Sequence, residues 1–335
     1  MSERDITAVQ DAVTSDLVSV VIPTYNRAHL LCDALHSVQA QTYRPLEVIV
    51  VDDGSTDETE SVFGSWVMGC DAALSARFES QDHKGGNAAR NLGIAKAEGA
   101  HIAFLDSDDL WKPEKITTQM LALSARPEVG AVYCGIEEVE IGSDEPPYRP
   151  KRPFPEGNLF RQLLVSDVTA PTSCYLIATS VLHKAGGFDE TLAARQDWDL
   201  WIRVARQTGI GAVPKPLVVL RNHAGPRTIS DPQRELRAHR AILDKYATDR
   251  RAAGRQVERE AMAAYHRRAG RVHFHHVRNA KLALAHYIRA IAWSPLTPDN
   301  YFALGGALLP GNTRRRLHRT WNAMFGRTAF RIKSH

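Results

Sequence analysis

Short, nearly continuous runs of apolar residues recur in the first third of the chain, at residues 18–22, 47–51 and 101–105. Strands as uniformly apolar as these are buried on both faces, which is typical of a parallel sheet. Segments with helical periodicity lie between and after the runs, at 28–39, 57–66, 87–97 and 112–124. The alternation predicts an α/β fold, a doubly wound and mostly parallel sheet with right-handed crossovers.

The carboxyl ends of parallel strands lie at one edge of a sheet, where ligands bind in open α/β folds. The segments that follow the three predicted strands carry acids, an aromatic residue and a cation. These segments are residues 23–27, 52–55 and 106–109. The sequence therefore predicts one crevice to which all three contribute.

The pattern changes near Asp231 and Pro232. A loop with Gly, Pro and Ser at 224–232 gives way to long segments rich in Ala and Arg. Helical periodicity predicts helices at 233–247, 255–276, 279–293 and 313–325. We therefore predict two parts, an α/β domain over residues 1–230 and a basic α-helical region over residues 231–335.

Charge is divided unequally between these parts. Residues 1–230 hold 21 Lys and Arg against 31 Asp and Glu, a balance of −10, whereas residues 231–335 hold 21 against 7, a balance of +14. The two parts are therefore expected to face different partners.

Near the end of the chain, cations alternate with apolar side chains. The cations are Arg314, Arg315, Arg316, Arg319, Arg327, Arg331 and Lys333, and the apolar residues are Leu317, Trp321, Met324, Phe325 and Phe330. One interpretation is a solvated helical cap, and an equally favoured one is contact with an anionic membrane surface or a lipid pyrophosphate. Nucleic acid is the least favoured partner and is not expected.

Composition limits the class of protein. With 335 residues and 44% hydrophobic content, the chain is expected to be globular. Residues 1–16 lack the apolar segment of a secretory signal, and the apolar run at 301–309 is about half of the roughly 20 residues that a membrane-spanning helix needs. The four cysteines form no CxxC pair, so neither a zinc site nor a disulfide framework is indicated. These features predict a cytoplasmic protein.

Six sequence blocks follow one another along the α/β part. They are VSVVIPTYNR (18–27), VIVVDDGSTDET (48–59), GGNAARNLGI (85–94), IAFLDSDD (102–109), GGFDETL (186–192) and QDWDLWIR (196–203). In order and spacing these blocks resemble the family 2 glycosyltransferases, over about residues 17–230. The resemblance implies a GT-A fold and an inverting enzyme that moves a sugar from a nucleotide diphosphate donor, with a UDP-sugar favoured. The implied acceptor is a glycan or a lipid-linked molecule in surface polysaccharide assembly.

The DSDD block offers up to three carboxylates on a tight turn after a strand, which suits a hard divalent cation. The alternative is a helix N-cap before residues 110–113. The resemblance implies that Asp106 and Asp108 hold Mg²⁺ or Mn²⁺ against the donor diphosphate, with Ser107 between them among the donor-binding residues. Whether Asp108 or Asp109 contacts the metal directly stays open.

The segments after the first two strands are candidates for binding the nucleotide. A capping box from Ser55 to Glu58 would make the second segment only a helix start, although both interpretations can hold together. The resemblance places the imide N–H of uracil on Asp53. Tyr25 offers a ring for the base to stack on, or else packs in a turn. The other donor-binding candidates are Pro23 and Thr24, and the phosphate neighbours Arg27, Lys84 and Arg90.

The QDWDLWIR block contains the candidate base. An inverting transfer needs a group that removes the acceptor proton, and an Asp beside a Trp at a helix start would be partly desolvated and more basic. The resemblance places this role on Asp197. Gln196 stands where the family usually has Glu, so a supporting carboxylate is missing from the block.

Neighbouring residues in the last two blocks are expected to be structural or are ambiguous. Asp199, Trp201 and Arg203 are expected to pack one helix face on the sheet with an ion pair. Asp189 lies either in a loop near the acceptor or in a simple turn.

A predicted strand near residues 218–223 ends in Arg221 and His223. The family often has a similar Arg-x-His, and His223 is a candidate for binding the donor phosphates or the metal, or else a satisfied polar residue.

Two other functions remain as alternatives. A sugar nucleotidyltransferase would need a glycine-rich N-terminal phosphate loop, which VIPTYNR lacks. A non-catalytic scaffold is disfavoured because Asp53, Asp106, Asp108 and Asp197 are all present.

Overall fold

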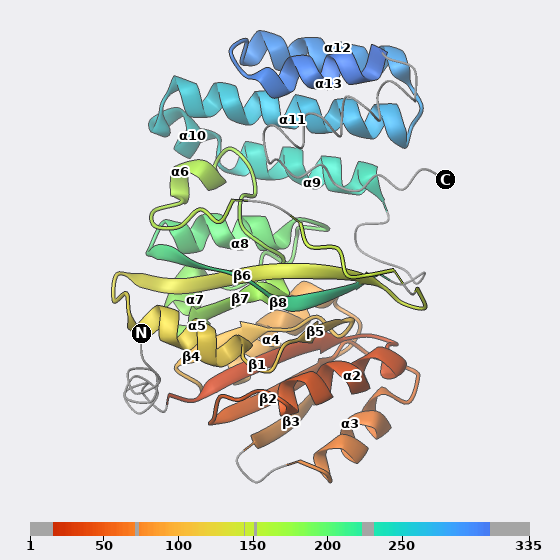
Figure 1. Ribbon diagram of the computed structural model, residues 1–335, viewed down its shortest axis with the longest axis vertical. Helices are drawn as coiled ribbons and strands as arrows, with labels where there is room; N and C mark the ends of the chain where they lie inside the picture. Colours follow the sequence, from red (N-terminus) through yellow and green to blue (C-terminus); the bar gives the residue numbers. More distant parts are fainter. Residues whose placement is uncertain (1–15, 71–73, 144, 151–152, 223–230, 309–335) are drawn as a thin grey trace.

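The computed structural model describes residues 16–70, 74–143, 145–150, 153–222 and 231–308. Figure 1 shows a twisted sheet with helices against it, and a stack of further helices beyond one side. The predicted helix at 313–325 and the basic cluster around it lie outside the described residues.

The described residues form one sheet of eight strands. Its strands are β1 (Val18–Thr24), β2 (Leu46–Asp52), β3 (Leu74–Ser80), β4 (His101–Phe104), β5 (Asp109–Trp111), β6 (Val129–Glu140), β7 (Tyr175–Ala178) and β8 (Gly209–Asn222). The spatial order is β3-β2-β1-β4-β7-β6-β8-β5. The first four strands of this order are parallel, β7 is antiparallel to both neighbours, and β5 runs antiparallel to β8. The predicted α/β class with a mostly parallel sheet is confirmed.

The alternating residues of β2 show why its apolar run is continuous. Val48 and Val50 belong to the main core, whereas Ile49 and Val51 pack on the other face with Ala89. Both faces of the strand are therefore covered by helices, as expected for a doubly wound sheet. The helices of this part are α2 (Ala28–Gln39), α3 (Thr59–Val67), α4 (Gly86–Lys96), α5 (Lys115–Ser124), α6 (Phe160–Leu163), α7 (Thr179–Ala185) and α8 (Gln196–Ala205).

The helix α4 approaches β1 unusually closely. A Cβ atom at Gly93 would lie 2.3 Å from Cγ1 of Val21, so this position requires glycine. The close approach brings Arg90, one turn earlier, to the carboxyl edge of the sheet.

The predicted capping box is wrong. Helix α3 begins at Thr59 and not at Ser55, because the Ser55 side chain is used elsewhere. Its hydroxyl donates to Asp52 and accepts from the backbone N–H of Asn26, at 2.8 Å. Asp57 instead accepts from the backbone N–H of Ala28 at 3.0 Å and of Thr59 at 3.2 Å. Residues 52–57 therefore form a tight loop that holds the starts of two helices at the crevice.

Within residues 231–308, five helices form the outer stack in Figure 1. They are α9 (Pro232–Lys245), α10 (Ala247–Ala253), α11 (Arg255–His275), α12 (Ala280–Trp293) and α13 (Pro298–Leu308). Three of them match the predicted segments 233–247, 255–276 and 279–293, and Asp231 caps α9 by accepting from the backbone N–H of Gln233 at 2.9 Å. Ile242, Leu243 and Tyr246 belong to the same hydrophobic cluster as the sheet residues. The first helix of the stack therefore shares its core with the α/β part.

Among the described helices, none combines the length and the apolar composition needed to cross a membrane.

Candidate functional site

Asp53 organises the loop beside the end of β2. Its carboxylate is 3% exposed and accepts from the Gln81 side chain at 2.7 Å and from the backbone N–H groups of Lys84 and Gly85 at 2.8 and 2.9 Å. Gly85 has φ +95°, a conformation that favours glycine. The contacts of Asp53 thus order loop 81–85, a role that the sequence did not indicate, and a bond to a base remains a prediction.

Tyr25 lies on the surface next to this loop. Its side chain is 41% exposed, and its ring packs on the ring of His83 with centroids 4.2 Å apart. Nδ1 of His83 lies 3.0 Å from Oδ2 of Asp53. One face of Tyr25 is therefore covered by an imidazole that the sequence analysis missed, and a stacking base would use the other face or displace His83.

The acidic segment after β4 gathers three carboxylates. Asp106, Asp108 and Asp109 each offer an oxygen within 4.8 Å of the others. Asp106 pairs with Arg90 at 2.5 Å, and Asp108 pairs with Arg27 at 2.9 Å. Carboxylate oxygens are the ligands that Mg²⁺ and Mn²⁺ prefer, so this donor set fits the implied cation.

Burial distinguishes the members of this cluster. Asp109 is 7% exposed and accepts from the Ser173 hydroxyl at 2.6 Å, whereas the Asp106 and Asp108 side chains are 31% and 15% exposed. Asp109 also begins β5, so the alternative that DSDD is a helix N-cap is wrong. Asp106 and Asp108 are therefore the more accessible pair.

Of the other donor-binding candidates, three are buried, one is exposed and one lies outside the described residues. Pro23 and Thr24 are buried within β1, and the Thr24 hydroxyl has no hydrogen-bond partner among the described residues. Ser107 is 1% exposed and so is also buried. Lys84 is exposed and lines a hollow of about 760 Å³ with Gln81 and His83. His223 lies outside the described residues.

Arg221, the first residue of the predicted Arg-x-His, contacts both the acidic segment after β4 and helix α2. Its guanidinium donates to the Asp108 carbonyl at 2.8 Å and pairs with Asp33 of α2 at 2.6 Å. Arg221 is 7% exposed. In this structure Arg221 holds the turn of the acidic cluster against α2.

Asp197 lies in the first turn of α8 and is half-buried. Its Oδ1 accepts from the backbone N–H of Trp198 at 2.8 Å. Burial and then the like charge of Asp167 raise the pKa of Asp197 to about 6, although Arg195 and Arg90 oppose the shift. Because Arg90 also pairs with Asp106, the candidate base and the acidic cluster share an electrostatic neighbour.

Asp167 is a second carboxylate near Asp197 that the sequence analysis missed. Gln196 leaves the QDWDLWIR block without its usual acid, and the fold brings Asp167 from the loop after α6 instead. No local pattern marks Asp167, since 30 residues of sequence separate it from Asp197.

The rest of α8 packs as predicted. Asp199 is fully buried and pairs with Arg203 at 2.7 Å. The Trp201 ring stacks on Tyr175 with centroids 3.4 Å apart. These residues hold the helix on the sheet, and the prediction that they are structural is confirmed.

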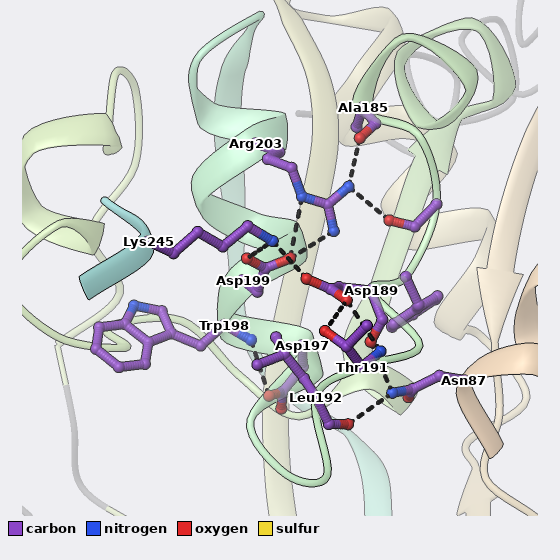
Figure 2. A network of polar contacts seen from close by, with 12 residues as sticks. Asn87, Ala185, Asp189, Thr191, Leu192, Asp197, Trp198, Asp199, Arg203 and Lys245 are labelled. Atoms are coloured by element: carbon purple, nitrogen blue, oxygen red, sulfur yellow. Dashed lines mark hydrogen bonds and ion pairs between the residues drawn. The ribbon is translucent and has the colours of Figure 1, made fainter. Parts of the chain in front are cut away.

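The loop between α7 and α8 belongs to a wider polar network, shown in Figure 2. Asp189 accepts from the backbone N–H of Thr191 at 3.0 Å, as a turn acid does, and also pairs with Lys245 of α9 at 2.7 Å. The side-chain amide of Asn87 donates to the carbonyls of Asp189 and Leu192, both at 3.0 Å. Asp189 therefore joins a turn to the helical region.

Comparisons with known proteins agree with this geometry. The family model for glycosyl transferase family 2 matches residues 19–182. An uncharacterized glycosyltransferase of Rickettsia prowazekii is 34% identical over 226 residues, which cover 64% of this chain and 67% of the relative. The putative teichuronic acid biosynthesis glycosyltransferase TuaG of Bacillus subtilis is 38% identical over 104 residues, 31% of this chain and 40% of the relative. Two relatives from Rickettsia felis and Rickettsia conorii are longer, and the chain spans about a third of their length, 35% and 36%.

Solved structures show the same fold at low identity. Residues 1–349 of S. aureus TarS in complex with UDP align with a TM-score of 0.59 at 20% identity, covering 95% of this chain and 94% of the other. The mannosyltransferase PcManGT from Pyrobaculum calidifontis, in complex with GDP-Man and Mn²⁺, aligns with a TM-score of 0.53 at 22% identity, covering 93% and 85%. Together, the matched sequence blocks, the sheet with its acidic edge and these relatives show that the chain is a member of glycosyl transferase family 2, with a GT-A fold.

Proposed function

We propose that the protein transfers a sugar, with inversion, from a nucleotide diphosphate donor to a glycan or lipid-linked acceptor in surface polysaccharide assembly. The observation that carries the proposal is the pairing of two kinds of acid at one edge of the sheet. An accessible carboxylate cluster after β4 suits a metal and a diphosphate, and a half-buried Asp197 at the start of α8 suits a base. Complexes of TarS with UDP and of PcManGT with GDP-Man and Mn²⁺ support a nucleotide-sugar donor.

The donor side of the site is assigned to the ends of β1, β2 and β4. Asp106 and Asp108 would hold a divalent cation, Mn²⁺ or Mg²⁺, with Arg27 and Arg90 beside them. When bound, the cation supplies positive charge against the departing nucleoside diphosphate. Tyr25 would contact the base, and we favour uracil because UDP is bound in the TarS complex.

The acceptor side is assigned to Asp197. In an inverting transfer the acceptor hydroxyl attacks the anomeric carbon from the face opposite the leaving group, and a carboxylate removes its proton. A pKa of about 6 leaves Asp197 mostly ionised at neutral pH and makes it more basic than an ordinary aspartate. The burial of Asp197 and the like charge of Asp167 would therefore make the proposed base more basic.

A panel of nucleotide sugars tests this function. We expect UDP, GDP or dTDP sugars to raise the melting temperature of the protein, with a larger rise in the presence of Mn²⁺, because ligands that bind only the folded state stabilise it. Measurement by thermal shift with and without Mn²⁺ selects the nucleotide and the sugar. If no nucleotide sugar shifts the melting temperature under either condition, the proposed donor class is wrong.

The helical region is proposed to bring the enzyme to an anionic membrane surface. Its balance of +14 adjoins an α/β part at −10 that already binds an anionic donor, so a second negative partner is favoured. In this proposal residues 1–230 act as the transferase domain, and residues 231–335 attach it to the inner face of the cytoplasmic membrane.

Vesicle flotation tests the attachment. The full chain should float with vesicles that contain anionic lipid, since each cation near such a surface adds about 1 kcal/mol, and should float less as salt rises. Replacement of Arg314, Arg315, Arg316 and Arg319 by Gln should reduce flotation at low salt, and neutral vesicles serve as the control. Equal flotation of parent and variant with anionic vesicles would assign these arginines to a solvated cap.

A further inference from the structure

Helix α9 contacts the segment around the candidate base at three points. Glu235 lies 4.0 Å from the guanidinium of Arg195, and the ring of His239 packs edge-on against Trp198 with centroids 4.8 Å apart. Lys245, the last residue of α9, lies 2.7 Å from Oδ1 of Asp199. Contacts to residues 195, 198 and 199 therefore flank Asp197 on both sides in sequence.

The first contact supports an unusual backbone conformation. Arg195 immediately precedes α8 and has φ +57°, in the left-handed region that few residues other than glycine adopt. Its guanidinium lies 5.5 Å above the Trp198 ring and faces Glu235, which also pairs with Arg268 of α11. A strained residue persists where its surroundings hold it. Glu235 thus helps to hold the turn at Arg195, which sets the orientation of the first residues of α8.

The third contact joins the loop between α7 and α8 to helix α8 itself. Nζ of Lys245 lies 2.7 Å from a carboxylate oxygen of Asp189 and 2.7 Å from one of Asp199, as Figure 2 shows. Asp199 is fully buried, so its charge depends on Lys245, on Arg203 and on the Tyr246 hydroxyl, which donates at 2.8 Å. Although partial burial opposes the shift, hydrogen bonds from Lys245 and Thr191 lower the pKa of Asp189 to about 2. Lys245 therefore lies between two carboxylates that come from separate parts of the site.

Helix α4, on the donor side of the site, also contacts the 186–192 loop. Asn87 of α4 donates to the Asp189 carbonyl at 3.0 Å, and Asn91 donates to the Phe188 carbonyl at 2.9 Å. Helix α4 also carries Arg90, the partner of Asp106. A continuous set of polar contacts thus runs from the acidic cluster through α4 and the 186–192 loop to Lys245 and α8.

We propose that Lys245 and Glu235 are positioning residues that hold Asp197 in place for transfer, so that α9 is part of the working site. This inference rests on the proposed role of Asp197 as the base. The family model ends at residue 182, before α8 and α9, so it assigns no role to either residue. Neither Lys245 nor Glu235 is proposed to contact the donor. Glu235 acts through Arg195, and Lys245 acts through Asp189 and Asp199.

Substitution of Lys245 tests the proposal in the full-length protein. Lys245→Met removes the ammonium and keeps an unbranched stem, whereas Lys245→Arg restores a cation. The assay is nucleotide release from the donor that the thermal-shift panel selects, with water as acceptor. We expect Lys245→Met to lower kcat at least tenfold while the Kd for the nucleotide with Mn²⁺ stays within twofold, and Lys245→Arg to recover most of the rate. Lys281→Met, on the exposed surface of α12, is the matched control and should match the parent.

Two results would overturn the proposal. One is a kcat for Lys245→Met within twofold of the parent. The other is a parallel loss of kcat, nucleotide affinity and melting temperature that Arg does not restore, which would make Lys245 a structural contact only. If Lys245→Met does not fold, Glu235→Gln preserves shape and is judged by the same separation of kcat from Kd.

Asp197→Asn is assayed in the same experiment, so that failure of the proposed base can be distinguished from failure of its positioning by α9. Full activity of Asp197→Asn would remove the proposed base itself. Loss of activity in Asp197→Asn together with a parental rate in Lys245→Met would leave the base in place and reject only its positioning by α9.

Discussion

Replacement of Asp197 by asparagine should slow sugar transfer by about 10²- to 10⁴-fold, the range that a general base contributes. Asparagine has nearly the same shape but cannot accept the acceptor proton. Nucleotide binding with Mn²⁺ should stay within about twofold, because the carboxylates after β4 are unchanged. Release of nucleotide from the donor and calorimetric titration of the nucleotide measure the two quantities. Asp244→Asn, an exposed acid on α9 with 58% of its side chain accessible, is the matched control.

The pH profile gives an independent signature of the same residue. Because Asp197 must be ionised to accept a proton and its pKa in the free protein is about 6, kcat/KM of the parent should fall tenfold per pH unit below pH 6. Asp167→Asn removes a like charge, which lowers the pKa of Asp197, so the acid limb should move to lower pH. Transfer by Asp197→Asn within a few-fold of the parent, or a limb unmoved by Asp167→Asn, would contradict this assignment.

Replacement of both Asp106 and Asp108 by alanine should abolish the effect of Mn²⁺ on nucleotide binding. The two most accessible members of the acidic cluster are lost, and Asp109 remains held by Ser173. Without metal, the variant should bind UDP at least as well as the parent, because Arg27 and Arg90 lose their carboxylate partners and can face the diphosphate. Titration of UDP with Mn²⁺ and with a chelator separates the two effects.

Asp82→Asn is the control for this pair, since Asp82 is exposed and lines the neighbouring hollow without belonging to the acidic cluster. It should keep the parental response to Mn²⁺. If Mn²⁺ still strengthens UDP binding by the double variant as much as by the parent, the metal lies elsewhere and the assignment of Asp106 and Asp108 is wrong.

Much of the fold was predictable from sequence because local patterns determine it. The apolar runs of β1, β2 and β4 are continuous since both faces of those strands are covered. Helices α2 and α11 follow the predicted segments closely because their periodicity is long and uninterrupted. Edge strand β3 gave no comparable signal, since only Leu74 among its seven residues is buried.

The candidate site likewise has parts that the sequence predicted and parts that it did not. The acids after β4 and the Asp at the start of α8 were identifiable because the residues of each block are contiguous, and strand ends in a parallel sheet meet at one edge. The failed capping box shows the limit of a local rule. Ser55 follows the predicted motif, but Asp52 and Asn26 compete for its hydroxyl and the helix begins four residues later.

By itself, the sequence determined the α/β class, the alternation of β1, β2 and β4 with helices α2 to α5, and the acids that follow β4 and begin α8, since each depends on neighbours along the chain. Only the tertiary structure decided which groups surround those acids. His83 on Tyr25, Asp167 near Asp197 and Lys245 between Asp189 and Asp199 each come from a separate element. Lys245 and Asp189, for example, are 56 residues apart. Such contacts form because packing of the whole core brings distant segments together, and no periodicity or spacing along the chain encodes which side chains then meet.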